Sequence, residues 1–452
     1  MNQVEFSMKK ANFLNRRYAI RLGRRYAIAA AGVILLGVLG CPNLNNNDSA
    51  VAQSLPVQRQ ESPTTEQPAG EVVSEKLVAA NTKFGFKLFS EILKQDSGKN
   101  IFVSPYSVAI ALAMTYNGAS GATGQAMAKT LELQGISLQE INAANATLKA
   151  ILENSDPKVQ LTIANSLWAK QNYPFQQNFL QKNQNFYKAK VTNLDFSDPG
   201  APTVINNWVQ QSTGGKIDKI IENINSDDVL FLINAIYFNG KWTTAFDKKE
   251  TAEYPFYLPS GGQKQHPMMS QTGEYKYYET QKFQSVSLPY GKDERFSLYI
   301  FLPKPNSSLS ALHKDLNAEN WEKWMTQFKN REGFIRLPRF KMEYDIELSN
   351  ALKALGMEVA FSSQADFSGM VSNLSGMGKK LAISDVKHKT FVEVNEEGTE
   401  AAAVTSVTVF AVSAGINFEE PFEMIVDRPF FAAIRDNQTK TVLFMGSIVE
   451  PQ

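Results

Sequence analysis

The first strongly periodic stretch of the chain begins near residue 76. Leu77, Phe84, Leu88 and Ile92 recur at the spacing of one helix face, and Gly98 follows as a stop signal. The next run, 105-PYSVAIALAMTYNGAS-120, is apolar nearly all round, as a buried helix is. We therefore predict an amphipathic helix followed by a buried one at the start of the globular part.

Further along, the pattern changes to the short apolar runs of β-strands. The run 229-VLFLINAIYFNGKW-242 is apolar on both faces, which predicts a central strand, and only Asn234 interrupts it. Three more strand-like runs follow: 297–303, 334–340 and 441–449. Two strands, 430–436 and 441–448, joined by 437–440, form a predicted antiparallel hairpin. With no fixed-period repeat and no internal linker, residues 76–452 are expected to form one α+β domain with large sheets.

The N-terminal segment has a different pattern, with seven basic residues ahead of the uncharged run 26-YAIAAAGVILLGVLG-40. Fifteen apolar residues are short for a membrane span and typical of a secretory signal. Cys41, the only cysteine, follows at once, and 38-VLGC-41 resembles the bacterial lipobox, whose cysteine is lipidated. The alternative is an ordinary signal followed by a chance cysteine, and the pair Arg24-Arg25 leaves both general and twin-arginine export open. We expect an exported, extracytoplasmic protein that is either a membrane-tethered lipoprotein or secreted.

Residues 41–75 are rich in Asn, Gln, Ser, Pro and Glu and predict a disordered tether. A flexible chain of this length spans roughly 30 Å, so a lipid on Cys41 would let the domain stand off the membrane. Loss of residues 1–40 would take the net charge from +1 to −5, because they hold seven basic residues and one acid. A mildly acidic mature protein argues against nucleic acid as a partner.

The chain lacks the residue patterns that most enzymes need. It has three histidines and contains no HExxH, GxSxG or phosphate-binding loop. Paired Cys or His ligands for a metal are missing as well. Ser384 and Lys387 match an S-x-x-K pattern, but none of its companion motifs follows. We therefore expect no enzymatic activity, no metal and no cofactor.

The stretch 395-NEEGTEAAAVTSVTVFAVSAGIN-417 suits neither a plain helix nor a plain strand. Gly398 would break a helix, and Ala and Glu are weak strand formers. If residues 399–409 became a strand, alternate side chains would share a face of small or β-branched residues: Thr399, Ala401, Ala403, Thr405, Val407 and Val409. Glu400 would lie on the other face. Such a segment predicts a conformational switch that slips between existing strands.

Several stretches together resemble one family. The segment 395-NEEGTEAAA-403 resembles the reactive-loop hinge of inhibitory serpins, and 100-NIFVSPYSVAIALAMTYNGASGAT-123 resembles the family's N-terminal block. Other blocks follow in family order: 234-NAIYFNGKW-242, 337-LPRF-340, 384-SDVKHK-389 and 428-RPFFAAIRDNQTKTVLFMGSIVEP-451. The resemblance covers residues 76–452. It implies a bacterial serpin of the inhibitory type, with three β-sheets, a bundle of helices and an exposed reactive-centre loop.

The resemblance also assigns a reactive bond. In the family, the residue before the cut is the fourteenth after the hinge glycine, which gives Val412–Ser413 here. The segment leading to Arg428 is a few residues longer than in animal serpins, so Phe410–Ala411 is the second choice. The implied hinge is Glu396, Glu397, Gly398, Thr399, Glu400, Ala401, Ala402 and Ala403. A target serine protease would form a covalent acyl complex at the cut, and the freed loop would then insert into the main sheet, a switch known for serpins in general.

Residues that control sheet opening follow from the same resemblance. They comprise a polar cluster beneath the sheet, called the shutter (Ser104, Ser107, Asn234, His388), and the entry point of the loop, called the breach (Trp242, Arg339, Glu396). Val412 suits an elastase-like protease, and Phe410 suits a chymotrypsin-like or subtilisin-like one. We expect a monomeric suicide-substrate inhibitor of serine proteases. A serpin-fold protein that binds without inhibiting is the alternative.

Overall fold

The computed structural model describes residues 73–153, 156–372, 381–398 and 420–452. The described residues all lie within one compact unit, Gln67–Gln452. Its α-helices, counted within the described ranges, are α1 Glu75–Gln95, α2 Pro105–Tyr116, α3 Gly121–Thr130, α4 Leu138–Glu153, α5 Gln177–Tyr187, α6 Ala201–Ser212, α7 Leu309–Asp315, α8 Ala318–Met325 and α9 Ser349–Leu352. In this part of the chain no helix is both long and apolar enough to cross a membrane.

The strands form three sheets, as the family resemblance implied. The nine-stranded sheet has the order β1-β14-β13-β8-β7-β6-β9-β12, with β5 paired to β6. A second sheet has the order β3-β2-β4, and the third pairs β10 with β11. The strands are β1 Ile101–Val103, β2 Val159–Lys170, β3 Lys190–Leu194, β4 Leu230–Gly240, β5 Ala252–Tyr257, β6 Gln263–Glu279, β7 Phe283–Tyr290, β8 Phe296–Pro303, β9 Lys329–Pro338, β10 Phe340–Glu347, β11 Lys387–Val394, β12 Phe422–Ile425, β13 Phe430–Asp436 and β14 Val442–Ile448.

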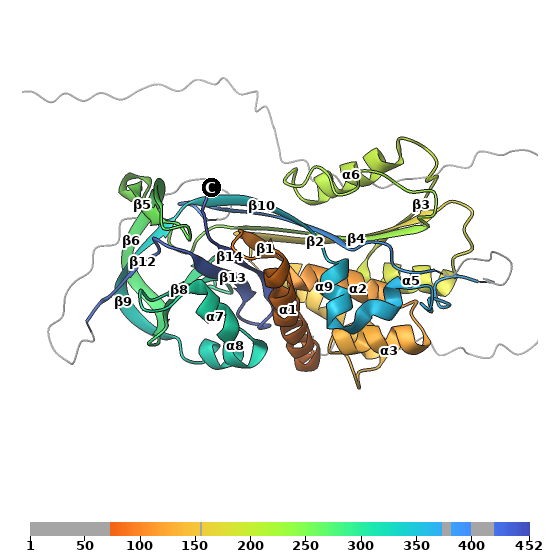
Figure 1. Ribbon diagram of the computed structural model, residues 1–452, viewed down its shortest axis with the longest axis horizontal. Helices are drawn as coiled ribbons and strands as arrows, with labels where there is room; N and C mark the ends of the chain where they lie inside the picture. Colours follow the sequence, from red (N-terminus) through yellow and green to blue (C-terminus); the bar gives the residue numbers. More distant parts are fainter. Residues whose placement is uncertain (1–72, 154–155, 373–380, 399–419) are drawn as a thin grey trace, which may run out of the picture. The chain divides into compact units, whose positions relative to one another are not determined.

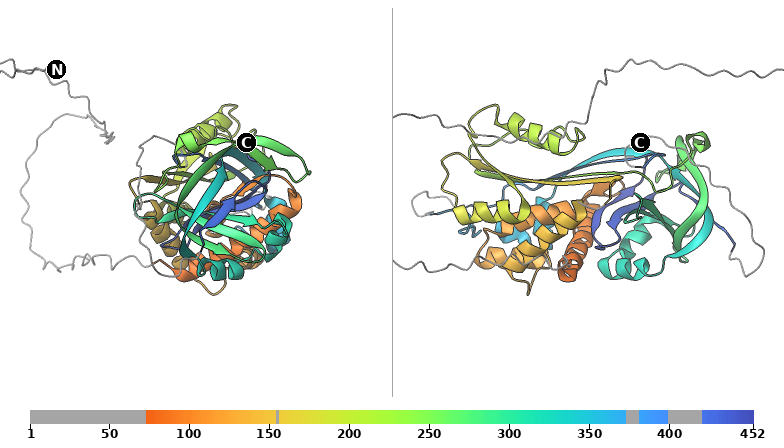
Figure 2. Two further views of the ribbon diagram at one scale, coloured as in Figure 1. Left: turned by 90° about the vertical axis from the view of Figure 1, so that its left-hand side faces the viewer. Right: turned by 180° about the vertical axis from the view of Figure 1, so that it is seen from behind.

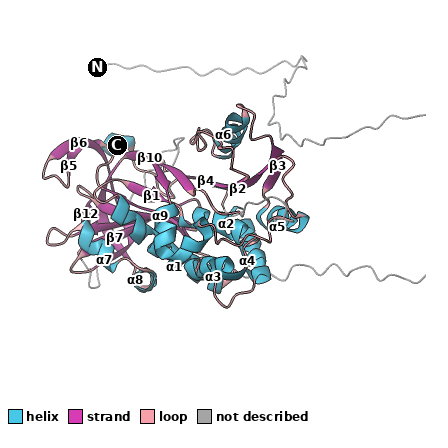
Figure 3. Ribbon diagram, turned by 45° about the vertical axis from the view of Figure 1, so that its right-hand side comes forward, coloured by secondary structure: helices cyan, strands magenta, loops and turns pink. Residues whose placement is uncertain are grey.

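The long strands β2, β4 and β10 form a layer with helices on both faces. Figure 1 and Figure 2 show α6 on one face of this layer and α1, α2, α3 and α9 on the other. Figure 3 shows the same separation by secondary structure. On the α6 side, Ile205 and Val209 pack with Ile233 and Trp168 in a small apolar cluster. The residues of the opposite face belong to the main core, which is continuous through the rest of the domain.

The predicted helices form where the sequence places them. Ser74 caps α1, because its side chain accepts a hydrogen bond from the Leu77 amide at 3.4 Å. Buried Phe84, Leu88 and Ile92 then line the face that meets the core. The second helix is shorter than predicted and ends at Tyr116 instead of residue 120. Asn117 and Gly118 follow the helix, and Gly118 packs so closely on Met370 that a side chain at this position would clash.

The predicted strands are present, with two differences. The hairpin of β13 and β14 is confirmed, with Phe430 opposite Ile448. The apolar run near Asn234 is β4, but the central position predicted for it is wrong, because β4 is the last described strand of the sheet β3-β2-β4. The run 334–340, however, serves two sheets, because β9 ends at Pro338 and β10 begins at Phe340. Arg339 stands between them, and its amide donates to the Pro267 carbonyl at 3.0 Å. One apolar run thus carries the chain from the nine-stranded sheet to the two-stranded one.

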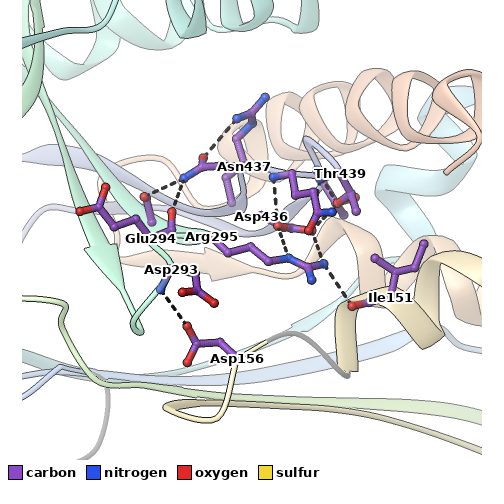
Figure 4. A network of polar contacts seen from close by, with 12 residues as sticks. Ile151, Asp156, Asp293, Glu294, Arg295, Asp436, Asn437 and Thr439 are labelled. Carbon is purple, nitrogen blue, oxygen red and sulfur yellow. Dashed lines mark hydrogen bonds and ion pairs between the residues drawn. The ribbon is translucent and has the colours of Figure 1, made fainter. Parts of the chain in front are cut away.

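A buried ion pair joins three parts of the fold near the end of β4 (Figure 4). The Arg295 guanidinium donates to both carboxylate oxygens of Asp436, at 2.9 and 3.0 Å, and to the Ile151 carbonyl at the end of α4. The turn just before Arg295 also holds β4, because the Gly291 amide donates to the Lys241 carbonyl at 2.8 Å. A bidentate pair of this kind fixes geometry as well as charge. The C-terminal end of β4 is therefore attached to a rigid part of the fold.

Candidate functional site

The candidate site lies along β4 and β11, each the outermost described strand of its sheet. Asn234 of β4 and His388 of β11 line the same cavity, of about 1200 Å³, which extends to α2. Farther along, Phe238 of β4 and Phe391 of β11 line a second, smaller cavity. Just beyond the C-terminal ends of the two strands, Lys241 after β4 forms an antiparallel bridge with Gly398 after β11. The two strands therefore run in the same direction beside one groove.

The first turn of α2 contacts both strands. Ser104 is the N-cap, and its hydroxyl accepts from the Ser107 amide at 3.2 Å. The Ser104 amide donates to Nε2 of His388 at 3.0 Å, and the Ser107 hydroxyl donates to Oδ1 of Asn234. The structure thus brings all four predicted shutter residues together, with one α2 residue for each strand. Their role in sheet opening stays a prediction.

His388 is buried in its neutral form. Its Nε2 accepts a hydrogen bond, so the proton of the ring lies on Nδ1. Burial lowers the pKa of His388 to about 4, from an ordinary value near 6.5. Because the folded-state pKa is the lower one, the unfolded chain binds more protons between the two values. The stabilisation from a neutral His388 is therefore present above pH 6.5 and is lost as the pH falls toward 4.

We expect His388→Gln to weaken the acid sensitivity of the protein. Between pH 7 and pH 5 the wild type should lose about 2 kcal/mol of unfolding free energy through this one group. Glutamine at position 388 does not titrate, so the variant should not lose this part of its unfolding free energy. Burial also lowers the pKa of His313 to about 4, but this histidine is present in both proteins and cancels. Urea unfolding at the two pH values measures the difference, and equal losses in both proteins would contradict the assignment.

The hinge begins with a tight reversal of the chain after β11. The amide and carbonyl of Asn395 bond the carbonyl and amide of Gly398 at 3.0 and 3.2 Å. Glu396 and Glu397 form the turn between them. Gly398 is thereby placed between Asn395 on one side and Lys241 on the other, with antiparallel bridges to both. It has a φ of +133°, and a Cβ atom there would lie 2.2 Å from the Gly240 carbonyl oxygen. Only glycine fits this position.

The predicted breach residues surround this turn. The indole Nε1 of Trp242 donates to the Asn395 carbonyl at 2.8 Å, and its amide donates to the Glu397 carbonyl at 3.0 Å. The Trp242 ring stacks on Tyr290 with centroids 4.3 Å apart. Nε of Arg339 lies 3.7 Å from Oε2 of Glu396. Trp242 thus contacts the backbone on both sides of Glu396, while Arg339 faces its carboxylate.

Two contacts at the breach were missed by the sequence reasoning. The Lys248 ammonium pairs with Glu397 at 2.5 Å, and the Thr251 hydroxyl donates to Glu396 at 2.8 Å. Both glutamates are buried, so each carboxylate needs such a partner. No local pattern could reveal these pairs, because about 150 residues separate the partners in sequence.

The other end of the predicted reactive loop is attached to the nine-stranded sheet. Phe422 of β12 stacks on Tyr277 with centroids 3.9 Å apart, over Gly333, where a side chain would clash with the ring. The Arg331 guanidinium donates to the Glu420 carbonyl at 2.7 and 3.2 Å. Residues 399–419 between the two attachments lie outside the described residues. They include the hinge residues from Thr399 to Ala403 and both candidate bonds, Val412–Ser413 and Phe410–Ala411, and Cys41 lies outside as well.

The histidines do not form a catalytic group. His266 contacts the Arg339 carbonyl, His313 contacts the Ser447 hydroxyl at 2.7 Å, and His388 contacts the Ser104 amide. Within the described ranges no set of three or more His, Cys, Asp or Glu residues could hold a metal ion. The groove between β4 and β11, with the contacts of Ser104 and Ser107 along it and the Lys241–Gly398 bridge at its end, is the candidate site.

Comparison with known proteins assigns the family. Residues 79–451 match the family model described as Serpin (serine protease inhibitor). The bovine leukocyte elastase inhibitor is 37% identical over 83% of this chain and 100% of its own length. An uncharacterised serpin-like protein of Thermococcus kodakarensis is 33% identical over 95% of this chain and 99% of its own.

Solved structures agree with this result. The native state of Tengpin, a thermophilic serpin, superimposes with a TM-score of 0.75 at 35% identity, covering 84% of this chain and 95% of that one. The fold, with its three sheets and surrounding helices, is the serpin fold that the sequence resemblance implied. The chain therefore belongs to the serpin family, a family of protease inhibitors rather than enzymes.

Proposed function

We propose that this chain is a suicide-substrate inhibitor of serine proteases, in which residues 399–409 insert as a strand between β4 and β11. The Gly398–Lys241 bridge carries the proposal, because it sets the register of such a strand. Continued antiparallel from this bridge, residue 399 would face Gly240 and residue 409 would face Leu230. The eleven residues from Thr399 to Val409 thus match the eleven residues of β4.

The faces of the two strands match as well. Directly opposed residues of an antiparallel pair point to the same side of a sheet. Thr405 would oppose Asn234, whose side chain points to α2, so the uncharged odd-numbered face would meet the main core. Ile236 and Phe238, on the same side of β4 as Asn234, belong to that core. Glu400 would point to the other side, away from the main core.

The chemical step belongs to the target protease. Its serine hydroxyl would attack the Val412 carbonyl, form an ester with Val412 and release the amine of Ser413. A dozen new ladder hydrogen bonds, at roughly 1 kcal/mol each, would then stabilise the inserted strand by on the order of 10 kcal/mol. This free energy becomes available only after the loop is cut, and it is comparable to the whole stability of an ordinary domain. In the proposed mechanism it drives insertion of the loop and displacement of the attached protease.

The target class follows from the residue before the cut. Val412 favours an elastase-like protease, in line with the leukocyte elastase inhibitors among the similar proteins. Phe410 at the second candidate bond favours a chymotrypsin-like or subtilisin-like one. We expect a band resistant to SDS, at the summed mass, after incubation with pancreatic elastase. Sequencing of the released C-terminal fragment should begin at Ser413, and a start at Ala411 would move the bond.

Complete cleavage without any adduct would instead favour the non-inhibitory alternative. Human thyroxine-binding globulin, crystallised with thyroxine, shares the fold with a TM-score of 0.75 at 27% identity. A protein that binds a small molecule is thus among the similar structures. Small residues at Thr399 and Ala401 to Ala403 favour insertion over this alternative.

We further propose that the protein is exported and tethered through Cys41. The proposal is supported by the basic segment, the fifteen-residue apolar run and the VLGC sequence that ends in the sole cysteine. Mass spectrometry of the mature N-terminus should find a diacylglycerol-modified cysteine as the first residue. An unmodified N-terminus at or beyond Cys41 would indicate a secreted protein instead.

A further inference from the structure

A buried asparagine on β2 lies directly behind the shutter. Asn165 is opposite Asn234 in the register of β2 and β4 and is 3% exposed. Nδ2 of Asn234 donates to Oδ1 of Asn165 at 2.6 Å, and Nδ2 of Asn165 donates to the Tyr187 carbonyl at 2.7 Å. A single polar chain therefore runs from Ser107 through both amides to a backbone carbonyl at the end of α5.

The carbonyl at the end of this chain sets its direction. A backbone carbonyl can only accept, so Asn165 must turn its Nδ2 toward Tyr187 and its Oδ1 toward Asn234. Asn234 must then present Nδ2 to Asn165, which leaves Oδ1 to accept from the Ser107 hydroxyl. Rotating either amide by 180° would place two oxygens against each other in a buried site, at a cost comparable to an unsatisfied polar group.

Tyr187 is itself held in place by a second row of asparagines. Its hydroxyl donates to Oδ1 of Asn142 at 2.8 Å, and Nδ2 of Asn142 donates to Oδ1 of Asn117 at 2.8 Å. Burial raises the pKa of Tyr187, so the hydroxyl keeps the proton that it donates. Asn117 is the residue that ends α2, so both ends of this helix belong to one buried network. The Tyr187 carbonyl that accepts from Asn165 is thus fixed relative to α2.

We propose that Asn165 is a positioning residue that fixes the Asn234 amide and thereby the contact between α2 and β4. Among the described contacts of Asn234, only the one with Asn165 selects the orientation of the Asn234 amide in which Oδ1 accepts from Ser107. The link to loop insertion rests on the proposed function, in which a new strand separates β4 from β11 beside the first turn of α2. Asn165 would then set how readily the groove opens.

A double-mutant cycle measured by hydrogen exchange tests the proposal. Exchange of the peptide Leu230–Gly240 is followed in the wild type, Asn165→Ala, Ser107→Ala and the double variant of the full chain. Each single substitution should speed exchange about fivefold, as loss of one buried hydrogen bond does. If Asn165 acts through Asn234, the double variant should exchange no faster than the faster single variant, because the same contact is already lost.

The control uses an asparagine on the other face of β4. Asn206 of α6 accepts from the Ile220 and Ile221 amides at 2.9 and 3.0 Å and donates to the Ile221 carbonyl at 2.7 Å, so its contacts lie outside the network of Asn165 and Tyr187. Asn206→Ala should therefore combine with Ser107→Ala multiplicatively. Should Asn165→Ala fail to fold, Asn165→Leu, which conserves volume, enters the same cycle. Two results would overturn the proposal. The first is a double variant of Asn165 and Ser107 in which the peptide exchanges about 25-fold faster than in the wild type, the product of two independent effects. The second is an Asn165 variant in which the peptide exchanges at the wild-type rate.

Hydrogen exchange reports on the uncut protein and needs no protease. A chain that traps no protease would still show the coupling between Asn165 and Ser107 in its exchange rates. The proposal for Asn165 and the proposal of an inhibitory function can therefore fail independently. If coupling is present, the inhibitory proposal predicts a further effect. Incubated at 45–50 °C without protease, the Asn165 variant should lose activity about fivefold faster than the wild type, through premature insertion.

Discussion

Gly398→Ala is expected to abolish the SDS-stable complex with elastase while leaving the loop cleavable. The added Cβ would lie 2.2 Å from the Gly240 carbonyl oxygen and 2.7 Å from Cα of Lys241, and the φ of +133° is rarely open to alanine. The first residue of the new strand could not then be seated between β4 and Asn395. Insertion would be slower than release of the cut protease, so the number of inhibitor molecules consumed per protease should rise more than tenfold.

Gly262→Ala is the matched control for this substitution. Gly262 has no positive φ, and the nearest atom to an added Cβ, the Ser260 hydroxyl oxygen, is 3.8 Å away. This variant should form the complex with the wild-type yield. A Gly398→Ala protein that also forms complex in full yield would show that the observed turn is not the start of insertion.

The features that could be predicted from the sequence are those with a local pattern. The apolar face of α1, the largely apolar run of β4 and the turn between β13 and β14 each specify their own structure within a few residues. Asn234 was conspicuous for a related reason, because a polar residue within an apolar run needs a partner when it is buried. The family resemblance marked Gly398 as part of a hinge, but the tight turn that the structure shows there was not predicted.

The rest depends on partners that are far away in sequence. Lys248 meets Glu397 only because the short segment before β5 lies against the turn that follows β11. Asn165 was not singled out in the sequence, and its place behind Asn234 emerges only from the register of β2 and β4. The division of the run 334–340 between two sheets likewise depends on where Arg339 meets Pro267. Long-range pairing of this kind has no signature in a single sequence.

Cleavage of the loop is expected to raise the unfolding midpoint of the whole domain. An inserted eleven-residue strand should add on the order of 10 kcal/mol to the free energy of unfolding. For a domain of this size, this corresponds to a rise on the order of 10 °C in the thermal midpoint. The measurement is a calorimetric scan before and after limited proteolysis within 399–419, with the two fragments kept together.

Two adjacent alanines make the expectation specific. Ala403 would oppose Ile236 and point into the main core, whereas Ala402 would oppose Tyr237 and share the face of Glu400. Ala403→Glu should therefore lose most of the gain on cleavage, because a buried unpaired carboxylate costs several kcal/mol. Ala402→Glu should keep most of it, and neither substitution should change the midpoint of the uncut protein. Equal gains in both variants would refute the register set by Gly398 and Lys241, since that register alone places one alanine inward and its neighbour outward.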